Sequence, residues 1–165
     1  MLRGEYPVDE PILIQKPVII RGVHGGFSDL FFINDPNYCG LKDGVVLVDN
    51  TASGIDVLKI GHGTEDYPIR FGVKIENIAV SAYKSSELPK EDTDYKAGAG
   101  ISIKDVNFVH LNRVAVYHKE WGVYTATSSG LPSPTPSNVL KFENVLLAYN
   151  KLGIEPVSYT HLRAH

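Results

Sequence analysis

A six-residue pattern of apolar and polar positions occurs four times in this chain. Each copy has an apolar residue, two polar residues, an aliphatic residue, a variable residue and a final apolar residue. The copies begin at Ile75, Ile103, Leu111 and Phe142. Apolar residues alternate with period two on each side of the polar pair, which is typical of strands with one buried face. Because the polar pair interrupts that alternation, each copy predicts two short strands joined by a bend.

The polar pairs also predict how the chain bends. Each pair contains an Asn or an Asp. These residue types adopt the left-handed backbone conformation at little cost, which suits a bend that keeps the apolar residues on both sides facing inward. No helical period of 3.6 residues persists in this region, so we expect an all-β chain.

A longer repeat accompanies the short pattern. Gly100, Gly122 and Gly153 each precede an aliphatic residue at the start of a predicted strand. Gly122 follows Gly100 by 22 residues, and Gly153 follows Gly122 by 31 residues, ten of which form the Pro/Ser/Gly-rich segment 128–137. A strand start that recurs at a near-constant interval indicates a coil that stacks on itself. Short strands at such corners predict a parallel β-helix.

The remaining elements follow from the same rules. Further strands are predicted at 30–33, 44–48 and 55–58. The charged segment 83–99 is poor in aliphatic residues, so we expect a solvated excursion there. We expect the strands that start at Ile55 and at the three glycines to stack on one face, with the loops 61–70 and 127–137 at its edge. Loops beside a flat strand face form a groove.

The N-terminal residues resemble a known family. The phrase Gly4-Glu5-Tyr6-Pro7-Val8, the run Ile12-Leu13-Ile14 and the phrase Lys16-Pro17-Val18-Ile19-Ile20-Arg21-Gly22 resemble the opening coil of pectate-lyase-like proteins. The resemblance implies a single-stranded right-handed parallel β-helix whose groove holds an extended polysaccharide. In that superfamily a capping amphipathic helix and a first strand usually precede this phrase. Neither is seen here, so the resemblance implies either that the fold is truncated at its start or that its cap is unusual.

The last nine residues are unlike the rest of the chain. Residues 157–165 break the alternation and resemble the translated sequence of a transposase adaptor used in DNA library preparation. We therefore expect residues 1–156 to form a β-helix fragment, truncated at both ends, and residues 157–165 to be a non-native tail.

Composition excludes several classes of function. The 165 residues are 43% hydrophobic and 21% charged, which is ordinary for one domain. The net charge of −3 argues against a nucleic-acid partner, and no run of 18 apolar residues predicts a membrane span. Residues 1–4 lack the apolar core of a secretory signal. The lone Cys39 excludes an internal disulfide, and no zinc-binding spacing occurs.

Candidate site residues come from the expected groove face and from the turn before Gly122. The candidate catalytic residues are Asp56, Glu120 and Glu155, because pairs of carboxylates act as acid and base in glycoside hydrolysis. The candidate substrate-binding residues are Lys104, His118, Trp121 and Tyr124, because sugar rings stack on aromatic side chains. The alternative is that these residues are an ordinary exposed ladder and that Trp121 covers the core at a corner.

More specific motifs are incomplete. Asn50-Thr51 and Gly61-His62-Gly63 resemble pieces of the polygalacturonase signature, but Ala52 stands where that signature has an Asp, and its Arg-Ile-Lys is absent. The calcium-binding Asp cluster of pectate lyases is not found. The acidic residues Glu87, Glu91, Asp92 and Asp94 could bind Ca²⁺, but a solvated charge run is the simpler interpretation, so no cofactor is predicted. We interpret His24, His62 and His110 as isolated turn or surface residues.

These observations support two classes of function. The resemblance implies a protein that binds and cleaves a polysaccharide, either a secreted lyase or hydrolase or a phage tailspike-like depolymerase. Such a protein would act outside the cell or on the virion surface, and a tailspike-like protein would be a homotrimer. The alternative is a non-catalytic adhesin, receptor-binding module or structural stalk.

Overall fold

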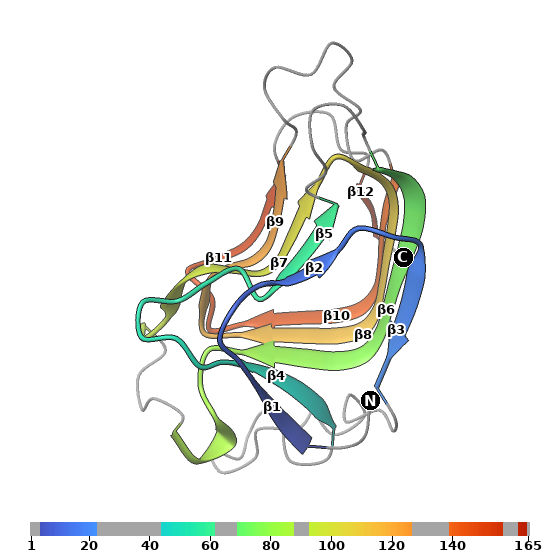
Figure 1. Ribbon diagram of the computed structural model, residues 1–165. Coiled ribbons are helices and arrows are strands. Elements are labelled where there is room, and N and C mark those ends of the chain that lie inside the picture. The colour runs from blue at the N-terminus through green and yellow to red at the C-terminus, as the bar shows by residue number, and fades with distance from the viewer. Residues whose placement is uncertain are drawn as a thin grey trace.

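The computed structural model describes residues 4–22, 44–61, 69–87, 93–126, 139–156 and 162–164, and these form an all-β chain (Figure 1). The strands are β1 (Gly4–Val8), β2 (Ile12–Ile14), β3 (Val18–Arg21), β4 (Val45–Asp49), β5 (Leu58–Gly61), β6 (Ile69–Ser81), β7 (Lys96–Lys104), β8 (Val106–Tyr117), β9 (Lys119–Ala126), β10 (Val139–Ala148), β11 (Leu152–Pro156) and β12 (Leu162–Ala164). A short 3-10 helix, η2 (Ser85–Glu87), lies between β6 and β7.

The strands form two parallel sheets that face each other across the core (Figure 1). One is five-stranded, with the order β11-β9-β7-β5-β2. The other is seven-stranded, with the order β1-β4-β6-β8-β10-β12 and with β3 paired to β6 outside this path. The prediction of an all-β chain built from stacked parallel strands is therefore confirmed.

The long strands β6, β8 and β10 bend where the sequence predicted. Asn77, Arg113 and Asn144 lie at the three bends with φ of 55°, 55° and 52°. Each bend divides its strand into a first limb (72–76, 108–112 and 139–143) and a second limb (78–81, 114–117 and 145–148), and the limbs align in register. The pattern that begins at Ile103 bends at Asp105, with φ of 54°, between β7 and β8. Asn and Asp occupy three of these four positions, and Arg113 is the exception.

The chain passes through three faces in a fixed order. β1 pairs with β4, and β4 pairs with the second limb of β6, whereas β3 pairs with its first limb. β2, β5, β7, β9 and β11 all belong to the five-stranded sheet. Each circuit therefore runs from the second-limb face to the five-stranded sheet and then to the first-limb face.

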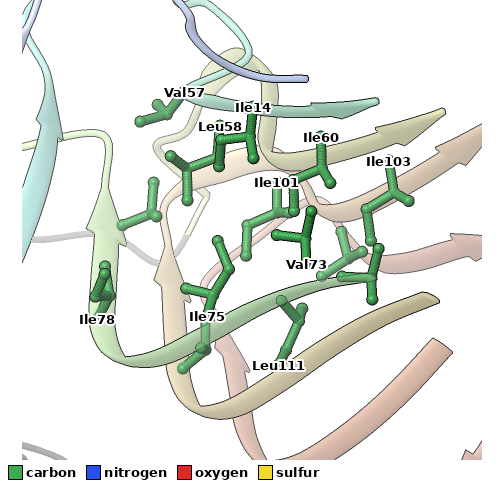
Figure 2. Packing of buried hydrophobic residues seen from close by; sticks show 14 of the residues in the cluster. Ile14, Val57, Leu58, Ile60, Val73, Ile75, Ile78, Ile101, Ile103 and Leu111 are labelled. Carbon is green, nitrogen blue, oxygen red and sulfur yellow. The ribbon is translucent and has the colours of Figure 1, made fainter. Parts of the chain in front are cut away.

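Stacking places like residues above one another in the core (Figure 2). Ile75 aligns with Leu111 in the first limbs, and Leu58 aligns with Ile101 in the five-stranded sheet. All four side chains are buried. Burial of each side chain adds about 1.5–3 kcal/mol to the free energy of unfolding, and contacts between neighbouring circuits add a similar term at each step of the stack.

The glycine repeat is confirmed, and it has a steric cause at Gly100 and Gly122 but not at Gly153, where a Cβ atom would lie 4.0 Å from Leu147 Cδ1. Gly100, Gly122 and Gly153 fall in line because Ile101 pairs with Val123, which pairs with Ile154. A Cβ atom at Gly100 would lie 2.3 Å from Val116 Cγ1, and one at Gly122 would lie 2.6 Å from the carbonyl oxygen of Gly153. The chain passes too close to its neighbours at these positions to accept a side chain.

Two predicted boundaries are wrong. The strand predicted at 55–58 is instead Leu58–Gly61, because the backbone N–H and C=O of Ile55 bond to the side chains of Asp49 and Lys119. The excursion predicted at 83–99 ends early, because β7 already begins at Lys96, whose backbone N–H donates to the carbonyl of His118.

Other predictions lie outside the described residues. These are the strand at 30–33, the loop at 127–137 and nearly all of the loop at 61–70. In the segment 157–165, only Leu162–Ala164 is described, as β12 parallel to β10.

Candidate functional site

The aromatic candidates lie together on β9 of the five-stranded sheet. Tyr124 aligns with Ser102, and Ser102 aligns with Lys59. The ring of Trp121 lies 5.6 Å from that of Tyr124, tilted by 49°. Trp121 Nε1 is buried and makes no hydrogen bond among the described residues. The backbone of Glu155 pairs with Tyr124, but its side chain lies outside the described part.

The charged candidates on this sheet have structural partners. Asp56 Oδ1 accepts a hydrogen bond of 2.8 Å from the backbone N–H of Ala99, and Asp56 Oδ2 lies 3.8 Å from Lys59 Nζ. Glu120 Oε1 lies 3.3 Å from Lys151 Nζ. Each of these carboxylates therefore binds a different neighbour. Lys104 is half-buried on β7 beside Gly61 of β5 and Ala126 of β9.

His118 is enclosed by aromatic rings. Its imidazole stacks on Tyr149 at 5.1 Å and meets the edge of Tyr83 at 5.7 Å. Its Nδ1 lies 2.9 Å from the carbonyl oxygen of Asp94, and only 5% of the residue is exposed. This ring holds a corner of the chain together and is closed to a polysaccharide.

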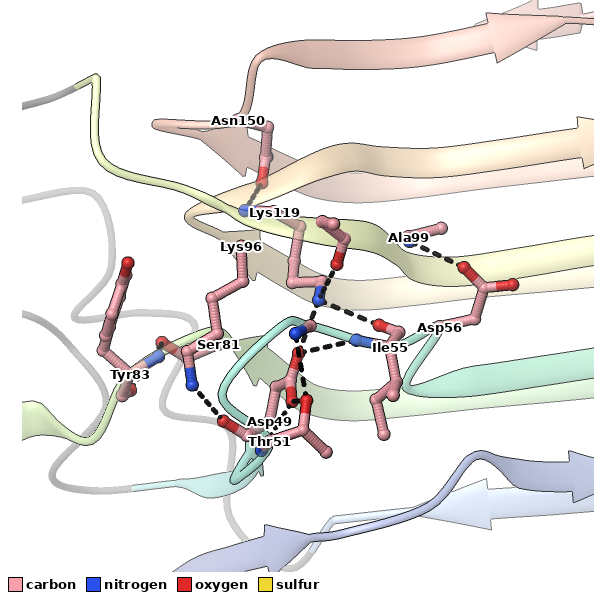
Figure 3. Close-up of polar contacts among 12 residues, drawn as sticks. Asp49, Thr51, Ile55, Asp56, Ser81, Tyr83, Lys96, Ala99, Lys119 and Asn150 are labelled. Atoms are coloured by element: carbon pink, nitrogen blue, oxygen red, sulfur yellow. Dashed lines mark hydrogen bonds and ion pairs between the residues drawn. The ribbon is translucent and has the colours of Figure 1, made fainter.

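A buried ion pair that no sequence pattern indicated lies beside that corner (Figure 3). Lys119 is 0% exposed, and its Nζ donates to Asp49 Oδ2 at 2.6 Å, to the carbonyl of Ile55 at 2.8 Å and to the carbonyl of Ala97 at 2.7 Å. These three acceptors match the three N–H donors of an ammonium group. The pair joins residues 70 positions apart in the chain.

The other contacts of Asp49 show that the pair is structural. Its carboxylate also accepts hydrogen bonds from the backbone N–H groups of Thr51 and Ile55 and from the Thr51 hydroxyl. Burial alone would raise the pKa of Asp49, but the hydrogen bonds from Lys119 and Thr51 outweigh it and leave that pKa lowered. Burial lowers the pKa of Lys119, and the contact with Asp49 opposes this. The Asp49 carboxylate and the Lys119 ammonium therefore bond to groups of the chain itself, and neither is open to a ligand.

An open groove of about 620 Å³ lies on the outer side of the first limbs. Its lining comprises Pro17, Val18, Ile19, Gly72, Val73, Lys74, Phe108, Val109, His110, Val139 and Lys141. One side follows the aligned residues Gly72, Phe108 and Val139. The face that carries this groove therefore differs from the face on which the sequence placed one.

The other side of the groove is a row of basic residues. Lys74, His110 and Lys141 align across β6, β8 and β10, and we call them the basic column. Neighbouring members are separated by one strand spacing, about 4.8 Å. The groove thus runs across the strands, along the direction in which the circuits stack.

Two carboxylates lie two positions further along the same strands. Glu76 accepts from Arg21 at 2.6 Å and from Lys74 at 2.5 Å, and its side chain is only 8% exposed. Glu143 accepts from Lys141 at 2.5 Å and contacts His110 Nε2 at 2.7 Å. The hydrogen bonds from Lys74 and Arg21 lower the pKa of Glu76 to about 2. Those from Lys141 and His110 lower the pKa of Glu143. Both groups are therefore carboxylates at neutral pH.

The charge of Glu143 assigns the tautomer of His110. An ionised carboxylate only accepts hydrogen bonds, so His110 Nε2 carries the proton in this contact. The lone pair of a neutral His110 then lies on Nδ1, which makes no hydrogen bond among the described residues. His110 is a surface residue as predicted, but its interpretation as isolated is wrong.

A signal for this site was present in the sequence. In three copies of the repeated pattern, the residue before the first apolar position is basic: Lys74, His110 and Lys141. Alignment of the copies would have placed these residues in one column. The groove itself also depends on the lack of a side chain at Gly72, which lies before the pattern begins.

Comparisons with known proteins assign no relative. No protein-family model matches the chain, and neither a curated protein nor a solved structure matches it. No helix in the described ranges is long and apolar enough to cross a membrane. Within the same ranges, no group of three or more His, Cys, Asp or Glu side chains could hold a metal ion. Glu91 and Asp92, two of the acidic residues considered for Ca²⁺, lie outside them.

Proposed function

We propose that this chain is a right-handed parallel β-helix of the pectate-lyase-like kind that binds an extended polysaccharide in the groove over its first limbs. The regular passage through three faces and the N-terminal phrase support the fold. The groove supports the function, because it runs along the stack across at least three circuits and so fits a long ligand. In the superfamily that the chain resembles, such a groove holds a polysaccharide.

The observation that carries this proposal is the contrast between the two sides of the groove. Phe108 is 56% exposed on one side, and the basic column lines the other. Sugar rings have apolar faces that pack on aromatic side chains and hydroxyl groups that bond to polar ones. Binding sites for such ligands combine apolar surface with a few polar groups that fix orientation.

Cleavage of the bound chain is a second candidate activity, and one observation favours it. His110 has its Nε2–H held by Glu143, which leaves the Nδ1 lone pair as a base beside the groove. A histidine oriented by a carboxylate is a common general base. Glu76 and Glu143 themselves are ionised, so neither supplies the proton that glycoside hydrolysis requires. The rival is a non-catalytic adhesin, receptor-binding module or structural stalk, which would cleave no glycan.

The test compares two substitutions that fill or flatten the groove with a matched control. Phe108→Ala removes the aromatic surface, and Gly72→Leu inserts a side chain, since a Cβ at Gly72 lies 3.6 Å from Phe108 Cβ, an ordinary contact. Leu13→Ala is the control, because Leu13 is 57% exposed on the five-stranded sheet, away from the groove. The wild type is first screened against a broad glycan panel, and affinities for the glycan found are then measured by calorimetry.

We expect Phe108→Ala and Gly72→Leu each to weaken binding by roughly tenfold, which corresponds to about 1.4 kcal/mol. Phe108→Ala loses stacking, Gly72→Leu blocks the groove, and Leu13→Ala should leave the affinity unchanged. Absence of any glycan ligand would favour the stalk. A ligand that changes Trp121 fluorescence and ignores both groove variants would place the site on the five-stranded sheet instead.

A further inference from the structure

We propose that the groove selects a glycan with a free hydroxyl group where the ligand passes His110, because His110 accepts a hydrogen bond there and its neighbours only donate. This inference rests on the proposed function, because it concerns the same groove. Among the described residues that line the groove, the polar side chains are those of Lys74, His110 and Lys141. They align in the basic column, so a ligand that lies along the groove meets them in turn.

The two outer members of the column can only donate hydrogen bonds. A lysine ammonium has three N–H donors and no acceptor. Lys74 directs a donor to Glu76, and Lys141 directs one to Glu143. The remaining donors suit any ligand oxygen, since hydroxyl, ether and ring oxygens all accept hydrogen bonds. These lysines therefore do not distinguish a free sugar from one whose hydroxyl groups are blocked.

His110 places the opposite demand on a ligand. Its Nε2–H donates to the Glu143 carboxylate at 2.7 Å, so Nδ1 of the neutral ring is an acceptor. Nδ1 has no hydrogen-bond partner among the described residues, and the His110 side chain is 24% exposed. The lone pair on Nδ1 repels a ligand oxygen that only accepts, whereas a hydroxyl group donates to it. The groove thus presents a donor, an acceptor and a donor in order, about 4.8 Å apart.

Glu143 is the positioning residue for this arrangement. A neutral imidazole carries its proton on either nitrogen, and the hydrogen bond made by one nitrogen decides which. Because the Glu143 carboxylate only accepts, it holds the proton of His110 on Nε2 and leaves the lone pair on Nδ1. It also bonds to Lys141 on its own strand, so it links two neighbouring members of the column. Loss of this carboxylate should therefore change what a ligand meets at His110.

The experiment compares hexasaccharides that have free hydroxyl groups with the same hexasaccharides after full O-methylation. Methylation removes every O–H donor and keeps the oxygens as acceptors. Cellohexaose, mannohexaose and xylohexaose are each measured in both forms with the full chain, by calorimetry at about pH 8, where an imidazole is neutral. We expect a free hexasaccharide to bind roughly tenfold more tightly than its methylated form, since a lost hydrogen bond that leaves an acceptor unpaired costs about that much.

Two variants separate the effect of the acceptor from the bulk of the methyl groups. His110→Phe removes the acceptor and keeps an aromatic ring, so the free hexasaccharide should lose its roughly tenfold advantage while the methylated form binds as before. Lys141→Met is the matched control. It should weaken both forms by the same factor, because methylated oxygens still accept hydrogen bonds.

Two substitutions of Glu143 test its positioning role. Glutamine keeps a carbonyl oxygen that accepts from His110 Nε2–H, whereas methionine has a similar length and no acceptor. Glu143→Gln should therefore keep most of the preference for the free sugar, and Glu143→Met should lose it. The nitrogen chemical shifts of the His110 ring report the tautomer directly. We expect the Nε2–H tautomer alone in the wild type and in Glu143→Gln, and a mixture of tautomers in Glu143→Met.

Equal binding of both forms to the wild type, or a preference for the free sugar that persists in His110→Phe, would overturn the inference and leave the proposed function intact. A wild-type His110 ring protonated on Nδ1 would do the same. Binding of none of these hexasaccharides would also overturn the inference, and together with a negative glycan panel it would overturn the proposed function as well.

Discussion

The buried pair of Asp49 and Lys119 gives the sharpest prediction for stability. We expect Lys119→Met to lower the free energy of unfolding by about 3–5 kcal/mol, the usual loss when one partner of a buried ion pair is removed. Methionine has a similar length and no donor. It leaves the carboxylate of Asp49 buried without its cation, and it leaves the carbonyls of Ile55 and Ala97 without the Lys119 donor.

The size of this loss follows from the contacts. The carbonyl groups of Ile55 and Ala97 each lose a donor, and the buried carboxylate of Asp49, left without its cation, accounts for most of the cost. Against a typical total stability of about 5–15 kcal/mol, the loss is large. The contribution of Asp49 itself is present above its ordinary pKa of 3.8 and is lost as the pH falls below that value, because its folded pKa is lowered.

The assay is urea denaturation followed by far-ultraviolet circular dichroism, with a double-mutant cycle. Asp49→Asn combined with Lys119→Met should be more stable than the sum of the single losses predicts, by about 1–3 kcal/mol, because no buried charge remains. The stability loss of Lys119→Met alone should also become smaller toward about pH 4, because an Asp49 that lacks its cation is then protonated and neutral. Lys151→Met, which removes an exposed lysine paired with Glu120, is the control and should leave the denaturation midpoint nearly unchanged. A loss below about 1 kcal/mol for Lys119→Met would refute the reasoning.

Two further predictions concern the bend at Arg113 and the ion pairs of Glu76. Arg113→Asn should stabilise the chain by about 0.5–1 kcal/mol, because Arg113 adopts φ of 55°, which asparagine tolerates better; an unchanged or lower denaturation midpoint would contradict this. Glu76→Gln should lower the free energy of unfolding by about 1–2 kcal/mol at neutral pH. The shift of the Glu76 pKa from 4.5 to about 2 would correspond to a larger loss, but solvent screens the interaction because its partner Arg21 is 63% exposed. This difference should persist above about pH 4.5 and vanish as the pH falls toward 2, whereas a difference independent of pH would exclude the ion pairs as its cause.

The elements that depend on local chemistry were predictable from the sequence. Asn77 and Asn144 sit at bends because their residue type tolerates the conformation that the interrupted alternation demands. Gly100, Gly122 and Gly153 could be recognised as a repeat because the two intervals are 22 and 21 residues when the ten residues of segment 128–137 are left out. Parallel pairing followed from that interval, since each circuit must return to the same face in the same direction.

The candidate site was predicted less well, because it depends on register between circuits. Tyr124 and Trp121 lie near each other, but Asp56 and Glu120 each bind separate partners. The groove arises only when Gly72, Phe108 and Val139 align, and the lengths of the intervening segments decide that alignment.

By itself, the sequence determined the repeating unit: strand, bend and close-packed glycine, each set by conformational preferences within a few residues. The tertiary structure alone decided which side chains meet across circuits. Asp49 and Lys119 are 70 positions apart, and His110 and Glu143 are 33 apart, so neither pair leaves a local pattern. Contacts between circuits depend on the register of parallel strands, and a shift of one residue would turn each of these side chains to the opposite face.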